Sequence, residues 1–264
     1  MSETKTISLA SSFLFSLAAW LVVGGLTILL FSLGLFALPF TLLTNHGSGY
    51  YHHLISRWWA LSISILVPLW EIEVEGLEQI EKNKPYVIVS NHQSFLDILV
   101  LLKEIPLHFK FIVKKDLFQV PIFGWHLFLA RYIPLDRNKL RSWRICLEQA
   151  RKWLRGGASV LFFPEGTRTT DGQIQEFKSG AFKLALEEKI DVLPVVIVGT
   201  RESLPKHSWR IRGQHVRSKI RLVVERPISA QDLSVECLES FKTKIRAEMV
   251  ESFQRIKADK RVPA

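Results

Sequence analysis

The sequence predicts one α/β domain with a largely parallel sheet flanked by helices, preceded by an apolar helical membrane anchor. Two observations support this fold class. The N-terminal part is a long apolar run, and after residue 70 short β-rich runs alternate with helical patterns. We therefore expect a membrane-anchoring segment at residues 1–69 and an α/β domain at residues 70–264.

The N-terminal run contains no Asp, Glu, Lys or Arg between Thr6 and Ser56. Its apolar core, residues 8–43, is much longer than the roughly 20 residues that cross a bilayer. It also exceeds the apolar region of about 7–15 residues in a secretory signal. We expect this run to tilt, to break at Gly24-Gly25 or Pro39, or to extend past the bilayer. Membrane attachment is predicted, with spanning and re-entrant arrangements both open.

A second segment, Tyr50–Trp70, mixes aromatic rings with basic groups. This mixture is typical of the headgroup region of a bilayer, so we expect an interfacial segment. A second buried or spanning helix is the alternative. The aromatic and basic residues concerned are Tyr50, Tyr51, His52, His53, Arg57, Trp58, Trp59 and Trp70.

The net charge of +10 lies almost entirely beyond residue 69 and favours an anionic partner. The apolar N-terminus favours lipid over nucleic acid, and no nucleic-acid-binding motif is present. If the run spans once, the basic body should face the cytoplasm, as in a protein of the inner membrane. Two distant cysteines exclude a disulfide framework and suit a reducing compartment, and no cluster of metal ligands is visible. We expect neither a metal nor a cofactor.

The α/β pattern has one particularly clear helix, residues 140–155. Its apolar residues recur at 3-4 spacing on one face, which predicts core packing, and Gly156-Gly157 ends it. A long C-terminal helix is expected at 233–257. Strands are predicted at 70–75, 86–90, 109–113, 132–135, 159–163, 192–198 and 220–224.

The loop after the predicted strand 86–90 holds His92 and Asp97. Imidazole is the side chain best suited to accept a hydroxyl proton near neutral pH, and a nearby carboxylate can orient it. On one continuous helix the two would point about 140° apart. The capping pattern Ser94-x-x-Asp97 predicts a helix start at Ser94, which allows His92 and Asp97 to converge. Asp97 as a simple helix cap is the alternative.

Two further loops follow predicted strands. The first contains Glu165, Gly166 and Arg168; the arginine fork suits a phosphate, whereas Glu165 would pair an arginine or bind a substrate hydroxyl. Lys178 adds a cation shortly after it. The second loop ends in Asp136-Arg137, which alone would be an ordinary ion pair.

Four segments in this order resemble the 1-acylglycerol-3-phosphate acyltransferases and related glycerolipid acyltransferases. They are His-Gln-Ser-Phe-Leu-Asp at 92–97, Ile-Pro-Leu-Asp-Arg at 133–137, Phe-Pro-Glu-Gly-Thr-Arg at 163–168 and Val-Leu-Pro-Val-Val at 192–196. Leucine stands before the Asp-Arg pair where related sequences vary. The resemblance covers residues 70–227 well.

The resemblance implies transfer of a fatty acyl group to the sn-2 hydroxyl of 1-acylglycerol-3-phosphate, giving phosphatidic acid. The donor would be a thioester of coenzyme A or of acyl carrier protein. His92 would be the general base, oriented by Asp97. The acceptor's phosphate and glycerol would be bound by Lys115, Arg137, Glu165, Gly166, Thr167, Arg168 and Lys178.

Other functions remain open on the sequence alone. A sister acyltransferase would act on another lysophospholipid, a lyso-aminolipid or glycerol-3-phosphate. A non-catalytic lipid-binding protein of the membrane would not need His92, Asp97 and Glu165 together. A membrane-tethered nucleic-acid-binding protein would show steeply salt-dependent binding.

Overall fold

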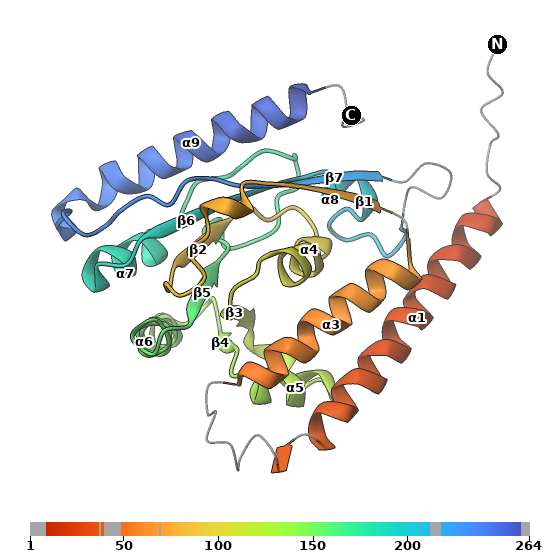
Figure 1. Cartoon of the computed structure of the whole chain (residues 1–264). Helices are drawn as coiled ribbons and strands as arrows, with labels where there is room; N and C mark the ends of the chain where they lie inside the picture. The colour runs from red at the N-terminus through yellow and green to blue at the C-terminus, as the bar shows by residue number, and fades with distance from the viewer. Residues whose placement is uncertain (1–8, 37, 40–48, 69, 212–217, 260–264) are drawn as a thin grey trace.

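The structure is a computed structural model that describes residues 9–36, 38–39, 49–68, 70–211 and 218–259 (Figure 1). Helices and strands alternate along most of the chain, as the sequence predicts. The helices are α1 (Leu9–Phe36), α3 (Tyr50–Leu66), α4 (Leu96–Glu104), α5 (Phe123–Leu129), α6 (Leu140–Arg155), α7 (Gly180–Glu188), α8 (Thr200–Ser203) and α9 (Leu238–Ala258), with short 3-10 helices η1 (Leu77–Gln79), η2 (Lys115–Gln119) and η3 (Val235–Cys237).

The described strands form one seven-stranded sheet in the order β1-β7-β6-β2-β5-β3-β4. Its neighbouring strands are parallel except for β6 and β7, so the expectation of a largely parallel sheet is confirmed. The strands are β1 (Trp70–Glu75), β2 (Val87–Ser90), β3 (Phe109–Lys114), β4 (Ile133–Leu135), β5 (Ser159–Phe162), β6 (Val192–Val198) and β7 (Ser218–Val224).

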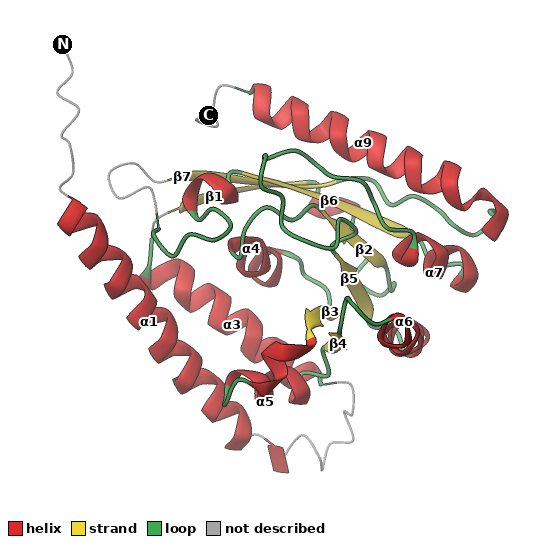
Figure 2. Ribbon diagram, turned by 180° about the vertical axis from the view of Figure 1, so that it is seen from behind, coloured by secondary structure: helices red, strands yellow, loops and turns green. Residues whose placement is uncertain are grey.

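Helices cover both faces of the sheet, which explains why its central strands are apolar on both sides. Every residue of β2, β5 and β6 is buried. On one face, α6, α7 and α9 pack against side chains such as Val160 and Val196. On the other face, α1, α3, α4 and α5 pack against side chains such as Leu161 and Ile197 (Figure 2).

The sheet places the polar loops together. Strand β5 runs parallel to both β2 and β3, and β4 runs parallel to β3. The loops that begin at Asn91, Phe163, Lys115 and Asp136 therefore leave the sheet at the same edge, where ligands bind in open α/β sheets.

Helix α1 is continuous through Gly24-Gly25, so of the alternatives from the sequence, a break at this pair does not occur. Its described residues run from Leu9 to Phe36, and Leu38 and Pro39 are also helical; residues 8, 37 and 40–43 of the predicted run lie outside the described residues. Within the described part of the chain, Phe13–Phe36 is the one helix long and apolar enough to cross a membrane. Glycine in a helix interior costs about 1 kcal/mol relative to alanine, which is too little to end a strongly apolar helix.

Helix α3 differs from the expected interfacial segment, because several of its polar and aromatic residues are buried against neighbouring elements, among them α1 and α5. His52, His53 and Trp59 are buried, whereas Trp58 is 66% exposed. His53 lies 3.2 Å from the Tyr132 hydroxyl and 3.1 Å from the carbonyl oxygen of Leu107. The helix therefore connects α1 to the α/β domain.

Candidate active site

His92 and Asp97 meet at the carboxyl end of β2, as the loop pattern predicts. Nδ1 of His92 lies 2.8 Å from Oδ2 of Asp97. Helix α4 begins at Leu96, slightly later than predicted, so His92 belongs to the loop and Asp97 to the first helical turn. The change from loop to helix removes the divergence that one continuous helix would impose.

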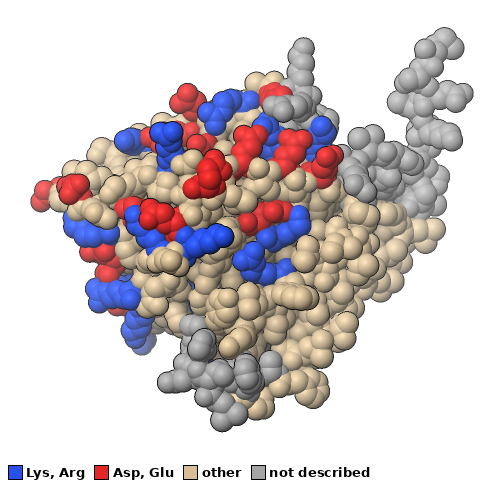
Figure 3. Space-filling model, in the orientation of Figure 1, with Lys and Arg blue, Asp and Glu red and all other residues tan. Residues whose placement is uncertain are grey.

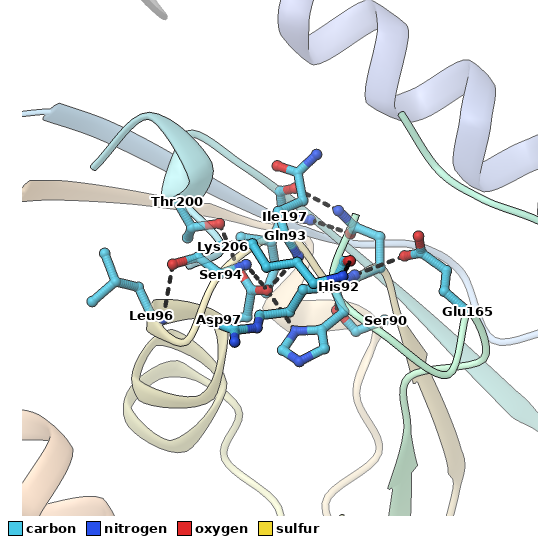
Figure 4. Close-up of polar contacts among 12 residues, drawn as sticks. Ser90, His92, Gln93, Ser94, Leu96, Asp97, Glu165, Ile197, Thr200 and Lys206 are labelled. Atoms are coloured by element: carbon cyan, nitrogen blue, oxygen red, sulfur yellow. Dashed lines mark hydrogen bonds and ion pairs between the residues drawn. The ribbon is translucent and has the colours of Figure 1, made fainter. Parts of the chain in front are cut away.

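The carboxylate of Asp97 is fully buried and also organises the loop around His92 (Figure 4). Its Oδ2 accepts hydrogen bonds from the backbone N–H groups of Gln93 and Ser94, at 2.7 and 2.8 Å. Its Oδ1 accepts the hydroxyl of Thr200 at 2.5 Å. Asp97 therefore holds both the backbone of the loop and the imidazole of His92.

The imidazole of His92 is held in one orientation. Its ring stacks on Phe163, with centroids 3.9 Å apart and an interplanar angle of 15°. Because Asp97 accepts the proton on Nδ1, the lone pair lies on Nε2, which has no hydrogen-bond partner among the described residues. An imidazole oriented in this way can accept a proton from a hydroxyl placed at Nε2.

A cavity of about 200 Å³ opens beside His92 and extends toward the N-terminal helices. Arg137 and Arg168 line it together with His92. Its remaining wall is mostly apolar and aromatic, with Lys114 and a small polar group of Ser56, His126 and Tyr132. The apolar lining residues include Phe31, Trp59, Phe95, Leu102, Phe111, Phe123 and Phe163.

Arg137 and Arg168 face the same cavity without an acidic partner among the ion pairs of the described residues. Partial burial and the positive charge of Arg168 lower the pKa of Arg137. Two guanidinium groups near each other and without a carboxylate form a site for an anion, and phosphate suits their planar forks. The sequence predicted both residues, and the structure brings them to one place.

Glu165 has different partners from those expected. Its Oε1 accepts the backbone N–H of His92 at 2.8 Å, and its Oε2 accepts the backbone N–H of Gln175 at 3.1 Å. Burial raises the pKa of Glu165 to about 7, although both N–H groups act in the opposite direction. The carboxylate is thus occupied by two loops of the protein, and it fixes the backbone of His92.

The other predicted binding residues are not among those that line the cavity beside His92. Gly166 has a positive φ of 74°, and a Cβ there would meet the side chain of Lys178 at 2.9 Å. The Lys178 ammonium group lies 5.7 Å from the ring centroid of Trp143. Thr167 is exposed and accepts a hydrogen bond from Lys206. Lys115 lies in a separate groove, on the outer side of β4.

The segment from Gly199 to Ile211 was not singled out from the sequence. It contains Thr200, which holds Asp97, and Lys206, whose Nζ lies 2.8 Å from the carbonyl oxygen of Arg168. Figure 4 shows Lys206 beside the His92 loop. The only local signal was the position of Gly199 directly after the strand β6, at the edge where the other functional loops begin.

The central part of the chain matches a known protein family. Residues 71–198 match the family model described as "Acyltransferase". These residues belong to the acyltransferase family. The resemblance seen in the four motifs is thereby confirmed, because all four lie within the matched residues.

The acyltransferase match is accompanied by similar proteins over a longer stretch. The chain is 41% identical over 203 residues to the chloroplastic 1-acyl-sn-glycerol-3-phosphate acyltransferase LPAT1 of Arabidopsis thaliana, covering 76% of this chain and 55% of that protein. It is 34% identical over 190 residues to 1-acyl-sn-glycerol-3-phosphate acyltransferase of Saccharomyces cerevisiae, covering 70% and 61%. The chain therefore spans little more than half of these relatives.

A solved acyltransferase shares nearly the whole fold. The crystal structure of the 1-acyl-sn-glycerophosphate (LPA) acyltransferase PlsC from Thermotoga maritima superposes with a TM-score of 0.79 at 25% identity. The superposition covers 94% of this chain and 97% of that one. The similarity thus includes α1 and α3 in addition to the acyltransferase residues 71–198.

Proposed function

We propose that this protein transfers a fatty acyl group from a thioester to the sn-2 hydroxyl of 1-acylglycerol-3-phosphate, giving phosphatidic acid. The observation that carries the proposal is the placement of His92, oriented by Asp97, in one cavity with Arg137 and Arg168. A base for a hydroxyl and a site for a phosphate lie together, and an apolar wall adjoins both. Relatives named for this acceptor support the choice.

The chemistry follows from the free Nε2 of His92. This atom removes the proton of the acceptor hydroxyl while the oxygen attacks the thioester carbonyl. The tetrahedral intermediate collapses, the C–S bond breaks, and the imidazolium returns the proton to the leaving sulfur as a free thiol. Asp97 stabilises the imidazolium between these steps. No covalent intermediate on the protein and no metal or cofactor is needed in this scheme.

The two arginines and the apolar wall bind different parts of the substrates. Arg137 and Arg168 bind the phosphate of the acceptor, which fixes its glycerol hydroxyls near His92. The cavity wall, from Phe163 to Phe31 and Trp59, receives a fatty acyl chain. Lys206 reaches the same region through Thr167 and Arg168, and adds positive charge there.

The site would work at the surface of a membrane. Helix α1 contacts the rest of the protein along its length, because Phe13 packs on Trp209 with ring centroids 5.1 Å apart and Phe31 stacks on His126 with ring centroids 3.8 Å apart. Between them, Trp20 donates to the carbonyl oxygen of Trp209 at 2.6 Å. Its opposite face exposes apolar residues, for example Leu21 at 68% and Phe36 at 82%. We infer that residues 1–69 anchor the chain with α1 lying along one leaflet, and that residues 70–264 face the cytoplasm at an inner membrane.

A donor–acceptor matrix on the detergent-solubilised protein tests the reaction. Labelled acyl-coenzyme A and acyl carrier protein are offered with 1-acylglycerol-3-phosphate, other lysophospholipids, lyso-aminolipids and glycerol-3-phosphate. We expect phosphatidic acid as the main product, and none from His92→Ala. Preferred acylation of another acceptor would favour a sister acyltransferase. No transfer from either donor would leave a lipid-binding role. The matrix also identifies the donor.

A cysteine introduced at Ser2, in a chain with Cys237→Ser, tests the orientation of the anchor. Labelling with a membrane-impermeant maleimide is compared in right-side-out and inside-out vesicles. Position 2 should be labelled from the same side as a tag at the C-terminus. Labelling from opposite sides would show that α1 spans the bilayer and overturn the in-plane arrangement.

A further inference from the structure

A second groove lies on the outer side of β4, the last strand of the sheet order. It has a volume of about 550 Å³ and is open to the surface. Residues of η2, the end of α5, β4 and α6 line it, whereas His92 and Arg168 do not. Tyr132 borders both this groove and the catalytic cavity. The groove is therefore a neighbour of the proposed active site and is not part of it.

The charged residues that line this groove are all cations. They are Lys115, Arg131 and Lys152, and no carboxylate joins them in the lining. Each is exposed, and none of the three takes part in an ion pair among the described residues. The nearest acid in sequence, Asp116, already pairs with Lys114 at 2.6 Å. Three cations without acidic partners make the groove a site for an anion.

Aromatic side chains complete the walls. Phe118, Phe128 and Trp153 line the groove between the three cations. The guanidinium carbon of Arg131 lies 5.5 Å from the ring centroid of Phe128, which holds the charge beside an apolar surface. Phe128 itself is 63% exposed.

The exposed apolar surface continues beyond the groove along α5 and η2. Trp125, one helical turn before Phe128, is 53% exposed, and Leu117 and Val120 are 39% and 44% exposed. The inner side of α5 contacts α1, since Phe123 and Phe31 have ring centroids 5.8 Å apart. Figure 3 shows charged side chains gathered over the upper and left parts of the molecule, whereas the surface over α1 is uncharged.

We propose that this groove binds the anionic headgroup of a bilayer phospholipid, with the phosphate between Lys115, Arg131 and Lys152. The acyl chains of the bound lipid lie across Phe128 and Trp125, toward the membrane. This lipid is a second one, distinct from the acyl acceptor beside His92, and it seats the α/β domain on an anionic bilayer. The site makes membrane attachment depend on lipid charge as well as on α1.

The shape and polarity of the groove favour a lipid over other anions. An amphiphile matches both the three cations and the adjoining apolar surface, whereas a nucleotide would leave that surface in water. A β-strand of a partner is disfavoured at this sheet edge, because Pro134 in β4 has no N–H to donate.

Native mass spectrometry of the full detergent-solubilised chain tests the proposal. The probes are short-chain phosphatidylglycerol, short-chain phosphatidylcholine and coenzyme A. The variant Arg131→Gln/Lys152→Gln removes two groove cations, and Lys244→Gln/Lys257→Gln on α9 removes two exposed cations on the other face of the sheet. We expect the groove variant to lose retention of phosphatidylglycerol, while the α9 variant and Arg168→Ala keep it.

Vesicle flotation measures how strongly the groove cations contribute to membrane binding. Each cation near an anionic surface raises the membrane binding constant by about a factor of five. The groove variant, which loses two cations, should therefore bind vesicles with about 30 mol% phosphatidylglycerol roughly 30-fold more weakly. Its binding to phosphatidylcholine vesicles should be unchanged, which also shows that α1 remains in place. An equal loss of vesicle binding in the α9 variant would overturn the proposal, because general surface charge would then explain the attraction to anionic lipid. Unchanged lipid binding with loss of coenzyme A retention would identify a nucleotide site.

Discussion

The hydroxyl of Thr200 lies 2.5 Å from the carboxylate of Asp97, although 103 positions separate them in the chain. Asp97 uses its other oxygen for His92 and two backbone N–H groups. Thr200 is thus the side chain that fixes the second oxygen, in a place where both residues are fully buried. The orientation of the His92 imidazole thus depends on a segment that follows a different strand, β6.

Thr200→Val tests this relationship. It keeps the shape of the side chain but leaves Oδ1 of Asp97 buried without a donor, which costs about 1–3 kcal/mol. We expect kcat for acyl transfer to fall about tenfold or more, with acceptor KM nearly unchanged. Thr200→Ser should restore the donor and most of kcat. Thr170→Val, at an exposed position, is the control, and equal effects of both variants would argue against the positioning role.

His92→Ala should reduce acyl transfer by at least about a hundredfold, because general-base catalysis contributes roughly 10²–10⁴. Vesicle binding and the circular dichroism spectrum should not change, because Asp97 keeps three other donors, the N–H groups of Gln93 and Ser94 and the hydroxyl of Thr200. Steady-state kinetics in detergent measures the effect. Near-normal transfer by this variant would remove His92 from the mechanism.

Arg168→Ala should raise acceptor KM about 10- to 100-fold, the range for one or two charge-assisted hydrogen bonds to a phosphate. KM for the donor should change little. The matched control is Arg226→Ala, at an exposed position of the α/β domain. A rise confined to the donor's KM would show that Arg168 does not bind the phosphate of the acceptor.

Glu165→Gln should lower kcat about tenfold and leave acceptor KM in place. The amide has only one oxygen for the two backbone N–H groups of His92 and Gln175, so the loop that carries the base loosens. Glu176→Gln, whose carboxylate is 84% exposed, is the neighbouring control. A selective rise in acceptor KM would instead support the interpretation from the sequence, in which Glu165 binds a hydroxyl of the substrate directly.

His126 should make the protein less stable in mild acid. Burial lowers its pKa from 6.5 to about 3, so the native state stays neutral while the unfolded chain takes up a proton below pH 6.5. Stability from this residue is complete above pH 6.5 and falls by about 2 kcal/mol on going to pH 5. Denaturant unfolding in detergent at both pH values measures the loss.

His126→Phe keeps the stacking on Phe31 and removes the proton site. Its loss of unfolding free energy between pH 7 and pH 5 should be smaller than that of the wild type by about 2 kcal/mol. His108, whose pKa burial also lowers to about 3, contributes equally in both proteins. An identical pH dependence in the two proteins would show that His126 does not titrate as described.

The sequence was most informative where local chemistry decides the structure. The strands β1 and β6 match their predicted bounds, because uninterrupted β-branched or alternating residues have few alternatives to a strand. The convergence of His92 with Asp97 followed from a cap that changes the backbone direction within a few residues. Leu140, in contrast, is 70% exposed although it lies on the apolar stripe of α6, at the first residue of the helix.

Contacts between distant segments were beyond local patterns. Thr200 and Lys206 have ordinary surroundings in the sequence and reach the site through the direction of β6. Glu165 belongs to a recognisable motif, but its partners are backbone groups, which no side-chain pattern records. His52 turns inward because it can bond the carbonyl oxygen of Gly34 on α1, at 3.2 Å.

Helix α1 also has a consequence for anyone producing this protein. Phe31 forms part of the cavity wall, and Thr27 accepts a hydrogen bond from Trp59 of α3 at 3.0 Å. Deleting α1 would therefore not yield a smaller water-soluble enzyme. The deletion would open the cavity to water and expose the apolar side chains of α3. Solubility is better engineered at the outward positions, such as Leu21, Leu29 and Phe36, where polar replacements leave the inner face intact.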